Sequence, residues 1–460
     1  MNGMTATQLD TQRVWDDAVR VLDEVGLEIG GEVLPRAVEG VFPIEQGRVR
    51  IAPDIANEYA DEIRERFGGP TEVEPVRAPR LYNLPLNPYW LDPSDGQIKP
   101  NDLDTVIRNT KLVYQVASES DGLVGPSVAG VPQDIPAEIQ FLMVYATECI
   151  YAPHPGAWGL MHSRRSMELI FEAADIMGAG KMVCAEPISP LRFGGQSVDL
   201  AIEAGREGIP VTVDCMPVLG VTAPADYHMA WSQSVAENLG AYILLRACGV
   251  ERVGAPSFRL FLPNPSAMTP YFSAPQHVAV LCMRRAVRAI FGLPTDGGEV
   301  MLVASKAPDA QAVMEKAACC ALAKAHGFKH LEGAGMLWID EVFSPQQLMI
   351  DVEIARFVSA TDVSIAPPSG DIVSAVRDGL DAGSFLGSDL MLERFREFAW
   401  DAELSDLGPR GSWQGDHTTL LNRAAELARA KAAAYTYELS DHRRDAMDAL
   451  IARATSEFTK

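Results

Sequence analysis

The sequence predicts an α/β protein built on an eight-stranded (β/α)8 TIM barrel, with an N-terminal accessory region and a C-terminal helical cover. Its 460 residues are enough for one barrel of roughly 250–300 residues with additions. Short apolar runs alternate with helices whose ends are chemically marked, as in parallel βα units. Two of these runs, 182–187 and 210–217, pass from small apolar residues to a single carboxylate and then into a loop. Barrel enzymes carry their catalytic groups at such strand ends.

Residues 1–100 are expected to form the accessory region. Apolar periodicity predicts helices at 11–25 and near 53–67, with a short segment at 47–51 between them. Proline is then frequent up to residue 100, which argues against helix and predicts a segment that wraps around the barrel. Its aromatic residues are expected to pack on the barrel flank rather than line a pocket: Tyr82, Tyr89 and Trp90.

The barrel itself is predicted at 101–387. Ser163 is expected to cap a helix that ends at Gly178, and Ser344-Pro345-Gln346-Gln347 has the form of a capping box with proline at the first helical position. An eighth strand is placed near 363–366, after seven others at 123–128, 148–151, 182–186, 211–216, 252–256, 299–303 and 329–332. Residues 388–460 are amphipathic and are predicted to form the helical cover.

Charge and composition narrow the classes of partner. The chain has 62 acidic and 39 basic residues, a formal net charge of -23, so nucleic acid and anionic membranes are not expected partners. No apolar run is long enough to span a bilayer, and the N-terminus lacks the features of a signal peptide. Seven scattered cysteines without a C-x-x-C pair predict a reducing cytoplasm. Large acidic barrels commonly associate, so a homo-oligomer is among the expected states.

Several familiar catalytic arrangements find little support in the sequence. A Gly-x-Ser-x-Gly elbow, a His-Glu-x-x-His motif and phosphate-binding glycine loops are all missing, so no nucleophilic triad, metal site or nucleotide site is expected. Lys306 follows a predicted strand and is the lysine best placed to form a Schiff base. A barrel lyase or aldolase that uses Lys306 therefore stays an alternative.

Carboxylates at predicted strand ends are the richer signal. Glu186, Asp214 and Glu332 each end a strand and are candidate catalytic or positioning groups. Half-buried acids must be paired, hydrogen-bonded or turned toward a cation. Asp296 and Glu299 flank a glycine pair and are equally well explained by structural hydrogen bonds.

Aromatic residues near these ends suggest a cage for a quaternary ammonium, although each ring alone is more often part of a core. Arg192 or Arg259 is expected to bind a substrate carboxylate, unless it pairs with a loop acid. The candidate substrate-binding residues that complete the set are Trp158, Tyr227, His228, Phe258 and Trp338.

Several loops then resemble one known family. The runs are Glu-Pro-Ile-Ser-Pro-Leu-Arg-Phe at 186–193, Pro-Val-Leu-Gly-Val-Thr-Ala-Pro at 217–224, and Gly-Ala-Gly-Met-Leu at 333–337 with Ser344 to Asp351. Together they resemble the trimethylamine methyltransferase family over nearly the whole chain. The resemblance implies a βα barrel that moves a methyl group from a methylated amine to the cobalt of a separate corrinoid protein.

Founding members of that family use pyrrolysine at the barrel mouth, and this sequence contains only standard residues. It therefore looks like the branch that is similar to glycine betaine methyltransferases, which act on quaternary amines. The position equivalent to pyrrolysine is placed within 336–341. Under this interpretation Glu186, Asp214 and Glu332 are fixed charges around a cationic methyl donor. A non-catalytic betaine-binding protein is the remaining alternative.

Overall fold

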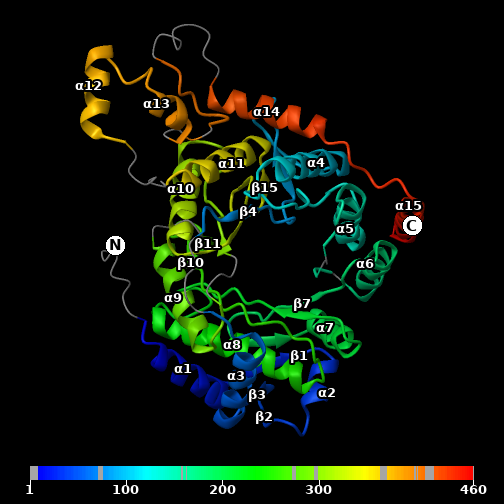
Figure 1. Ribbon diagram of the computed structural model, residues 1–460. Coiled ribbons are helices and arrows are strands. Elements are labelled where there is room, and N and C mark those ends of the chain that lie inside the picture. The colour runs from blue at the N-terminus through cyan, green and yellow to red at the C-terminus, as the bar shows by residue number, and fades with distance from the viewer. Residues whose placement is uncertain are drawn as a thin grey trace.

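Two groups of short strands in the α/β structure contain only parallel pairs (Figure 1). The computed structural model describes residues 9–70, 76–156, 159–161, 163–271, 276–294, 299–362, 370–397, 400, 402–409 and 419–458. In the first group β13 (His330–Glu332) lies between β12 (Glu299–Val300) and β4 (Arg80–Tyr82), and Val124 adds a bridge to Leu81. In the second, β7 (Val183–Ala185) pairs with β9 (Val211–Val213), which bridges to Val253. No strand pair joins the two groups within the described residues.

The N-terminal region is attached to the second group. Helix α1 (Thr11–Arg20) continues into a π-helical turn (Val21–Val25) that stops at Gly26, whose φ is +70°. Strand β1 (Leu27–Gly30) pairs antiparallel with β3 (Arg48–Val49) and parallel with β8 (Arg192–Gly194). The remaining elements here are α2 (Val33–Val38), β2 (Ile44–Glu45) and α3 (Pro53–Phe67). The helices predicted at 11–25 and near 53–67 are confirmed.

Helices cover the parallel strands, and most of them begin at chemically marked residues. Ser163 and Ser344 accept hydrogen bonds from the backbone amides of Ser166 and Gln347, as the capping patterns predict. The helices are α4 (Leu103–Glu119), α5 (Gln140–Tyr151), α6 (Arg164–Met177), α7 (Gln196–Arg206), α8 (Tyr227–Ala247), α9 (His277–Ile290), α10 (Ala310–Ala325) and α11 (Pro345–Ser359).

Three strand predictions need correction. Residues 148–151 are the last turn of α5, whose side chains are buried on nearly all sides, and a short apolar run of this kind cannot be told from a buried strand by pattern alone. The segments 123–128 and 252–256 contribute single bridges rather than full strands. The expected wrapping segment contains β4, which the sequence did not predict. The eighth strand, near 363–366, lies outside the described residues.

Another sheet, which contains both parallel and antiparallel pairs, has the strand order β14-β15-β5-β6. It joins β5 (Tyr89–Leu91) and β6 (Ile98–Pro100) to the hairpin of β14 (Met336–Leu337) and β15 (Val342–Phe343). A separate hairpin pairs β10 (Leu262–Pro263) with β11 (Pro270–Tyr271). The β14-β15-β5-β6 sheet brings the proline-rich segment against the chain that follows β13.

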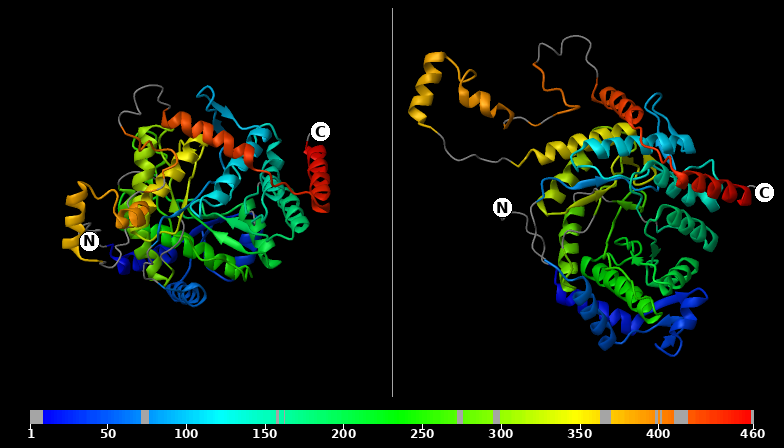
Figure 2. Two further views of the ribbon diagram at one scale, coloured as in Figure 1. Left: turned by 45° about the horizontal axis from the view of Figure 1, so that its top comes forward. Right: turned by 45° about the vertical axis from the view of Figure 1, so that its right-hand side comes forward.

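The C-terminal helices divide into two parts. Helix α14 (Leu420–Ala434) packs on α4 and α11, and α15 (His442–Phe458) packs on α6, so both act as the expected cover. Helices α12 (Ile372–Ala382) and α13 (Asp389–Arg394) instead project from the body of the molecule (Figure 2). No helix in the described part of the chain is long and apolar enough to cross a membrane.

Candidate functional site

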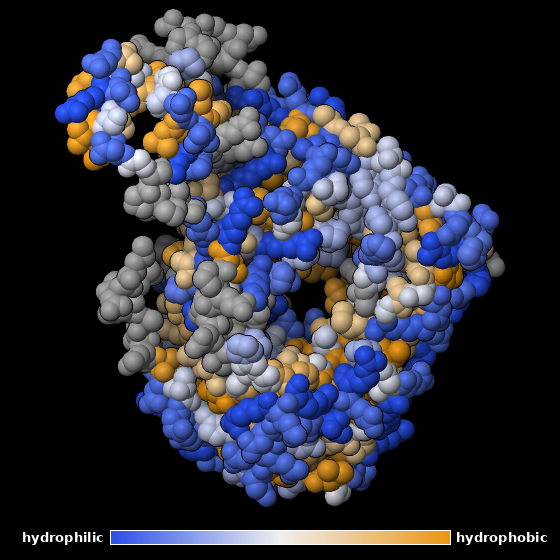
Figure 3. Space-filling view, in the orientation of Figure 1, coloured by the Kyte–Doolittle hydropathy of each residue, from blue (hydrophilic) through white to orange (hydrophobic). Residues whose placement is uncertain are grey.

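The strands place their polar side chains on one face and their apolar side chains on the other. Leu81, Val183, Val211 and Leu331 are at most 1% exposed and pack among the helices. Because successive strand residues point to opposite faces, their neighbours face away from the helices. Those neighbours, in or directly beside the strands, are Arg80, Tyr82, Cys184, Glu186, Thr212, Asp214, His330 and Glu332. Figure 3 shows a hollow near the middle of one face, between β4, β7 and α5.

Asp214 is the centre of a charged cluster just after β9. The Ser257 hydroxyl donates a hydrogen bond to its Oδ1, and the Arg259 Nε lies 3.3 Å from its Oδ2. The side chains of Arg259 and Asp214 are 17% and 28% exposed, so this ion pair is partly shielded from water. The segment that carries Ser257 and Arg259 follows Val253, the bridge partner of β9.

Glu186, just after β7, adds a second carboxylate to this cluster. Although the residue keeps contact with solvent, partial removal of water from its carboxylate and the nearby charge of Asp214 raise its pKa above 4.5. Arg259 acts in the opposite direction and lowers that pKa. Both carboxylates therefore lie near the guanidinium of Arg259. Burial raises the pKa of the neighbouring Cys184 thiol to about 12, so this thiol is not an activated nucleophile.

Glu332 belongs to a second cluster, at the end of β13. Its register partner on β4 is Tyr82, whose ring meets the ring of His330 edge to face at 5.6 Å. The guanidinium of Arg80 lies 5.3 Å from the centre of the Tyr82 ring. A Cβ at Gly125 would overlap that ring, so glycine leaves the space that Tyr82 occupies. Tyr82 was expected to pack on the barrel flank and instead lies beside Glu332 and His330. Its strand is three residues long and flanked by prolines, so no alternation indicated which face the ring occupies.

Buried Glu237 of α8 fixes the loop after β7. Its carboxylate accepts hydrogen bonds from the Ser189 hydroxyl at 2.6 Å and from the Leu191 backbone amide at 2.8 Å. Gln233, one turn earlier on α8, donates a third at 2.9 Å. Burial raises the pKa of Glu237. Glu237 therefore positions the loop that begins at Glu186. None of these three hydrogen bonds joins it to the charged cluster.

A buried ion pair fixes the loop after β13 in a similar way. Lys316 of α10 and Asp351 of α11 are both fully buried, with Nζ 2.6 Å from Oδ2. Lys316 also donates to the carbonyl of Gly333, and Asp351 accepts from the amide of Gly335. The two glycines adopt φ values of +123° and +73°, which favour glycine. The loop after Glu332 is therefore held from both adjacent helices.

The proposed aromatic cage is not assembled by the described residues. Phe258 is fully buried and stacks on Phe291 at 4.5 Å, so its ring belongs to the hydrophobic core. Trp338 is 40% exposed in the turn between β14 and β15, where the Lys306 ammonium lies 5.7 Å from its ring centre. Tyr227 is half-buried at the start of α8 and packs on the core. Trp158 lies outside the described residues.

Two further candidates lie with the N-terminal region. Arg192 is in β8, where its register partner is Glu28 of β1, and it is exposed at the surface. His228 accepts a hydrogen bond at its Nε2 from the backbone amide of Asp10, 3.1 Å away, near the start of α1. The described contacts therefore bring together Glu186, Asp214 and Arg259, and they place Arg192 and His228 with the accessory elements.

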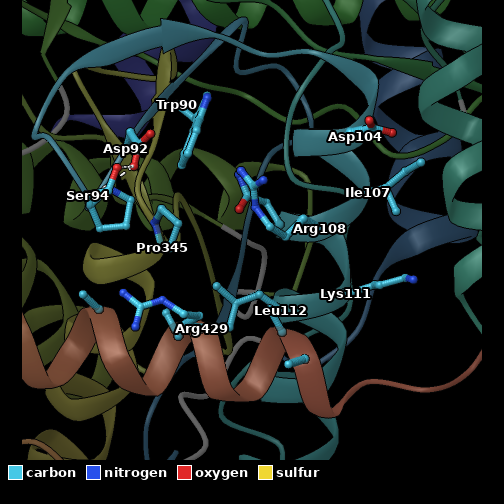
Figure 4. A pocket seen from close by; sticks show the side chains of 16 residues that line it. Trp90, Asp92, Ser94, Asp104, Ile107, Arg108, Lys111, Leu112, Pro345 and Arg429 are labelled. Atoms are coloured by element: carbon cyan, nitrogen blue, oxygen red, sulfur yellow. Dashed lines mark hydrogen bonds between the residues drawn. The ribbon is translucent and has the colours of Figure 1, made fainter.

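A cavity of about 600 Å³ opens elsewhere, between α4, α14 and the hairpin of β5 and β6 (Figure 4). Trp90 lies on one side of it, with the Arg108 guanidinium 4.8 Å from its ring centre. The strand-end carboxylates are not among its lining residues. Trp90 thus lines this cavity, and the cavity is separate from the charged cluster. No group of three His, Cys, Asp or Glu side chains that could hold a metal ion was found in the described ranges.

This is an α/β protein with a charged cluster at its strand ends. Two carboxylates follow β7 and β9, and a guanidinium from the segment after Val253 lies beside them. The profile of the family described as "Trimethylamine methyltransferase (MTTB)" matches residues 5–459. The chain belongs to this family.

Curated relatives agree with this assignment at low identity. The chain is 28% identical over 239 residues to a trimethylamine methyltransferase of Desulfitobacterium hafniense, an alignment that covers 49% of this chain and 46% of the relative. It is 25% identical over 215 residues to one of Methanosarcina mazei, covering 42% of this chain and 39% of the relative. The matched part thus spans about half or less of these relatives.

Among solved structures, the chain is similar to the monomethylamine methyltransferase MtmB of Methanosarcina barkeri. The TM-score is 0.46 at 13% identity, with 93% of this chain and 94% of the other covered. A hydroxylamine complex of MtmB gives a TM-score of 0.48 with the same identity and coverage.

Proposed function

We propose that this protein moves a methyl group from a quaternary amine, such as a betaine, to the cobalt of a corrinoid carried by a separate protein. The observation that carries the proposal is the pair of carboxylates after β7 and β9, Glu186 and Asp214, which lie near the guanidinium of Arg259. A quaternary ammonium has a fixed positive charge and no hydrogen to donate. It would balance the remaining negative charge without a directed hydrogen bond.

The chemistry asks little of the protein beyond binding and alignment. Cobalt(I) supplies the electron pair of the new cobalt–carbon bond, the carbon–nitrogen bond breaks, and its electron pair leaves with a neutral tertiary amine. No proton moves in this step. The residues at the strand ends would therefore act by holding the ammonium and aligning one methyl group.

Arg259 has a second role in this proposal. Its guanidinium makes an ion-pair contact with Asp214 through Nε, at 3.3 Å. A betaine carries a carboxylate that a guanidinium binds well, because its fork of donors matches two oxygens. We therefore propose that Arg259 selects betaines over simple methylamines, while Glu186 faces the ammonium.

The barrel prediction is part of the same proposal. Seven segments in chain order form the two groups through parallel contacts, namely β4, Val124, β7, β9, Val253, β12 and β13, and Gly159 is proposed as the eighth. Gly159 accepts a hydrogen bond from the amide of Cys184 of β7 at 3.1 Å, which extends the second group by one member. Closure of the eight into one barrel would turn both charged clusters toward a common cavity. The division into 1–100, 101–387 and 388–460 likewise remains a proposal, in which β4 is a barrel strand contributed by the N-terminal region.

A spectroscopic assay tests this function. Purified protein is mixed with cob(I)alamin and a panel of betaines and methylamines, and the spectrum of methylated cobalamin is followed. We expect transfer from at least one quaternary amine, and faster transfer when the corrinoid is carried by its protein. Folded protein that transfers from no member of the panel would contradict the proposal. All seven cysteines are free thiols, which supports a reducing cytoplasmic setting for such a reaction.

The alternative with a Schiff-base lysine has less support. The Lys306 ammonium donates to the Ala304 carbonyl and lies beside the Trp338 ring on the exposed surface. A Schiff-base lysine instead needs a desolvated or cation-flanked amine. Borohydride trapping with a carbonyl substrate separates the two functions, because a methyltransferase leaves no adduct.

A further inference from the structure

The projecting segment 370–397, here called the arm, contains α12, α13 and the turn between them. Nine of the 24 exposed large apolar side chains of the described residues lie within its 28 residues. These nine are Ile372, Val373, Val376, Leu380, Phe385, Leu386, Leu390, Leu392 and Phe395. Figure 3 shows apolar surface on this part of the molecule. A soluble chain rarely leaves so much apolar surface in one place without a partner.

Helix α12 concentrates this surface in one stripe. Ile372, Val376 and Leu380 are four residues apart and lie on the same face, and they are 73%, 40% and 73% exposed. Gly379 is the one buried residue of the helix, and it is covered by the ring of Phe385 from within the arm. None of the hydrophobic cores formed by the described residues includes a residue of the arm.

The arm therefore lacks the packing that stabilises a helix in a protein. Helix α12 has 11 residues, and isolated helices shorter than about 12–15 residues are marginal in water. An amphipathic helix of this length becomes stable when its apolar face is covered. We propose that the arm docks on a second copy of this chain and that this contact holds a homo-oligomer together.

The size of the surface fits such a contact. With roughly 100 Å² on each of the nine side chains, the arm offers about the 800 Å² that one partner buries in a standard stable interface. The charged residues of α12 lie outside this stripe. Apolar composition of this kind is typical of permanent interfaces between copies and is less typical of transient ones.

The position of the arm argues for a second copy rather than for the corrinoid carrier. The arm projects from the side of α10 and α11, away from β7 and α7 (Figures 1 and 2). A carrier that brings a methyl acceptor to Glu186 and Asp214 has to approach the ends of β7 and β9 and must leave after each transfer. Symmetric pairing of identical chains places the same surface on both partners and needs no other protein.

Light scattering coupled to size-exclusion chromatography tests the arm on the full chain alone, at micromolar concentration and without amine or corrinoid. We expect the wild type to have a mass that is a multiple of 49.9 kDa. Leu380→Asp and Leu386→Asp, at side chains 73% and 74% exposed, should each shift the mass toward that of one chain. Val41→Asp, at an exposed apolar position outside the arm, is the matched control and should keep the wild-type mass.

Circular dichroism checks that each variant is folded, which is expected because the substituted side chains have no core contacts in their own chain. A monomeric wild type, or an oligomer that both arm substitutions leave intact, would overturn the proposal. So would strong protection of the arm amides from hydrogen exchange in a monomer, which would mean that the arm packs on its own chain. Because the assay contains neither substrate, a negative result leaves the proposed methyl transfer untouched.

Discussion

At the scale of single residues, the candidate site rests on the charges after β7 and β9 more than on any aromatic ring. Asp214 has a hydroxyl and a guanidinium as partners, and Glu186 is left with a raised pKa beside it. The sequence predicted both carboxylates from their place at strand ends. It also predicted Arg259, but it could not show that Phe258, one residue earlier, points into the core.

Glu186 gives the site a predicted pH dependence. Its folded pKa lies above 4.5, so its carboxylate gains charge as the pH rises through that raised pKa. Binding of a quaternary amine should strengthen over the same interval, and Glu186→Gln should weaken binding at neutral pH and flatten the dependence. Calorimetric titration with glycine betaine from pH 5 to pH 8 measures both effects. Loss of one limb of the pH–rate profile with unchanged affinity would instead favour an acid–base role.

Glu237 should be needed for the loop after β7 rather than for binding itself. Glu237→Ala removes the acceptor for Ser189 and Leu191 and should cost about 2–4 kcal/mol of unfolding free energy. Glu237→Gln keeps the shape and should cost much less.

The raised pKa of Glu237 predicts how the unfolding free energy of wild type should change with pH compared with that of Glu237→Gln. The folded state holds the proton more tightly than the unfolded state, so the carboxyl's contribution to stability falls as the pH rises through its folded pKa. Urea unfolding at several pH values should show a smaller slope for Glu237→Gln than for wild type. Equal stability of the alanine variant and wild type would contradict the positioning role.

At the scale of elements, the helices on either side of β13 are joined by one buried ion pair. Lys316→Met should cost about 3–5 kcal/mol, because it leaves the Asp351 carboxylate buried without its cation. Lys316→Met combined with Asp351→Asn should recover part of that loss. Lys181→Met, which breaks a surface pair with Asp175, is the control and should cost at most about 1 kcal/mol. Urea unfolding measures all three, and similar costs for both lysines would argue against a buried pair.

Elements also differ in how far the sequence could predict them. Helices were predictable because caps such as Ser163 and Ser344 and the apolar period leave local signals. The parallel strands are two or three residues long and carry almost no period. Strand β4 was missed for this reason, and Tyr82 and Arg80 with it, while the apolar end of α5 was mistaken for a strand. Residues that act across long sequence separations, such as Glu237 on Ser189, leave no local pattern at all.

At the scale of the whole molecule, the protein combines a charged cluster at its strand ends with an exposed arm. The site is formed by segments that follow β7, β9 and Val253, and the arm projects from the opposite side. Membership of the trimethylamine methyltransferase family supports methyl transfer, and the pair of carboxylates supports a cationic donor. The central claim is that these carboxylates recognise the positive charge of the donor.

Comparison of a cation with its uncharged isostere tests that claim most directly. The best donor from the methyl-transfer panel is titrated against the same molecule with a tert-butyl carbon in place of the ammonium, which for glycine betaine is 3,3-dimethylbutyrate. We predict that wild type binds the cation at least about tenfold more tightly, a difference of about 1.4 kcal/mol. We also predict that the preference is lost in the Glu186→Gln, Asp214→Asn double variant. Equal affinity of wild type for the two molecules would contradict the account.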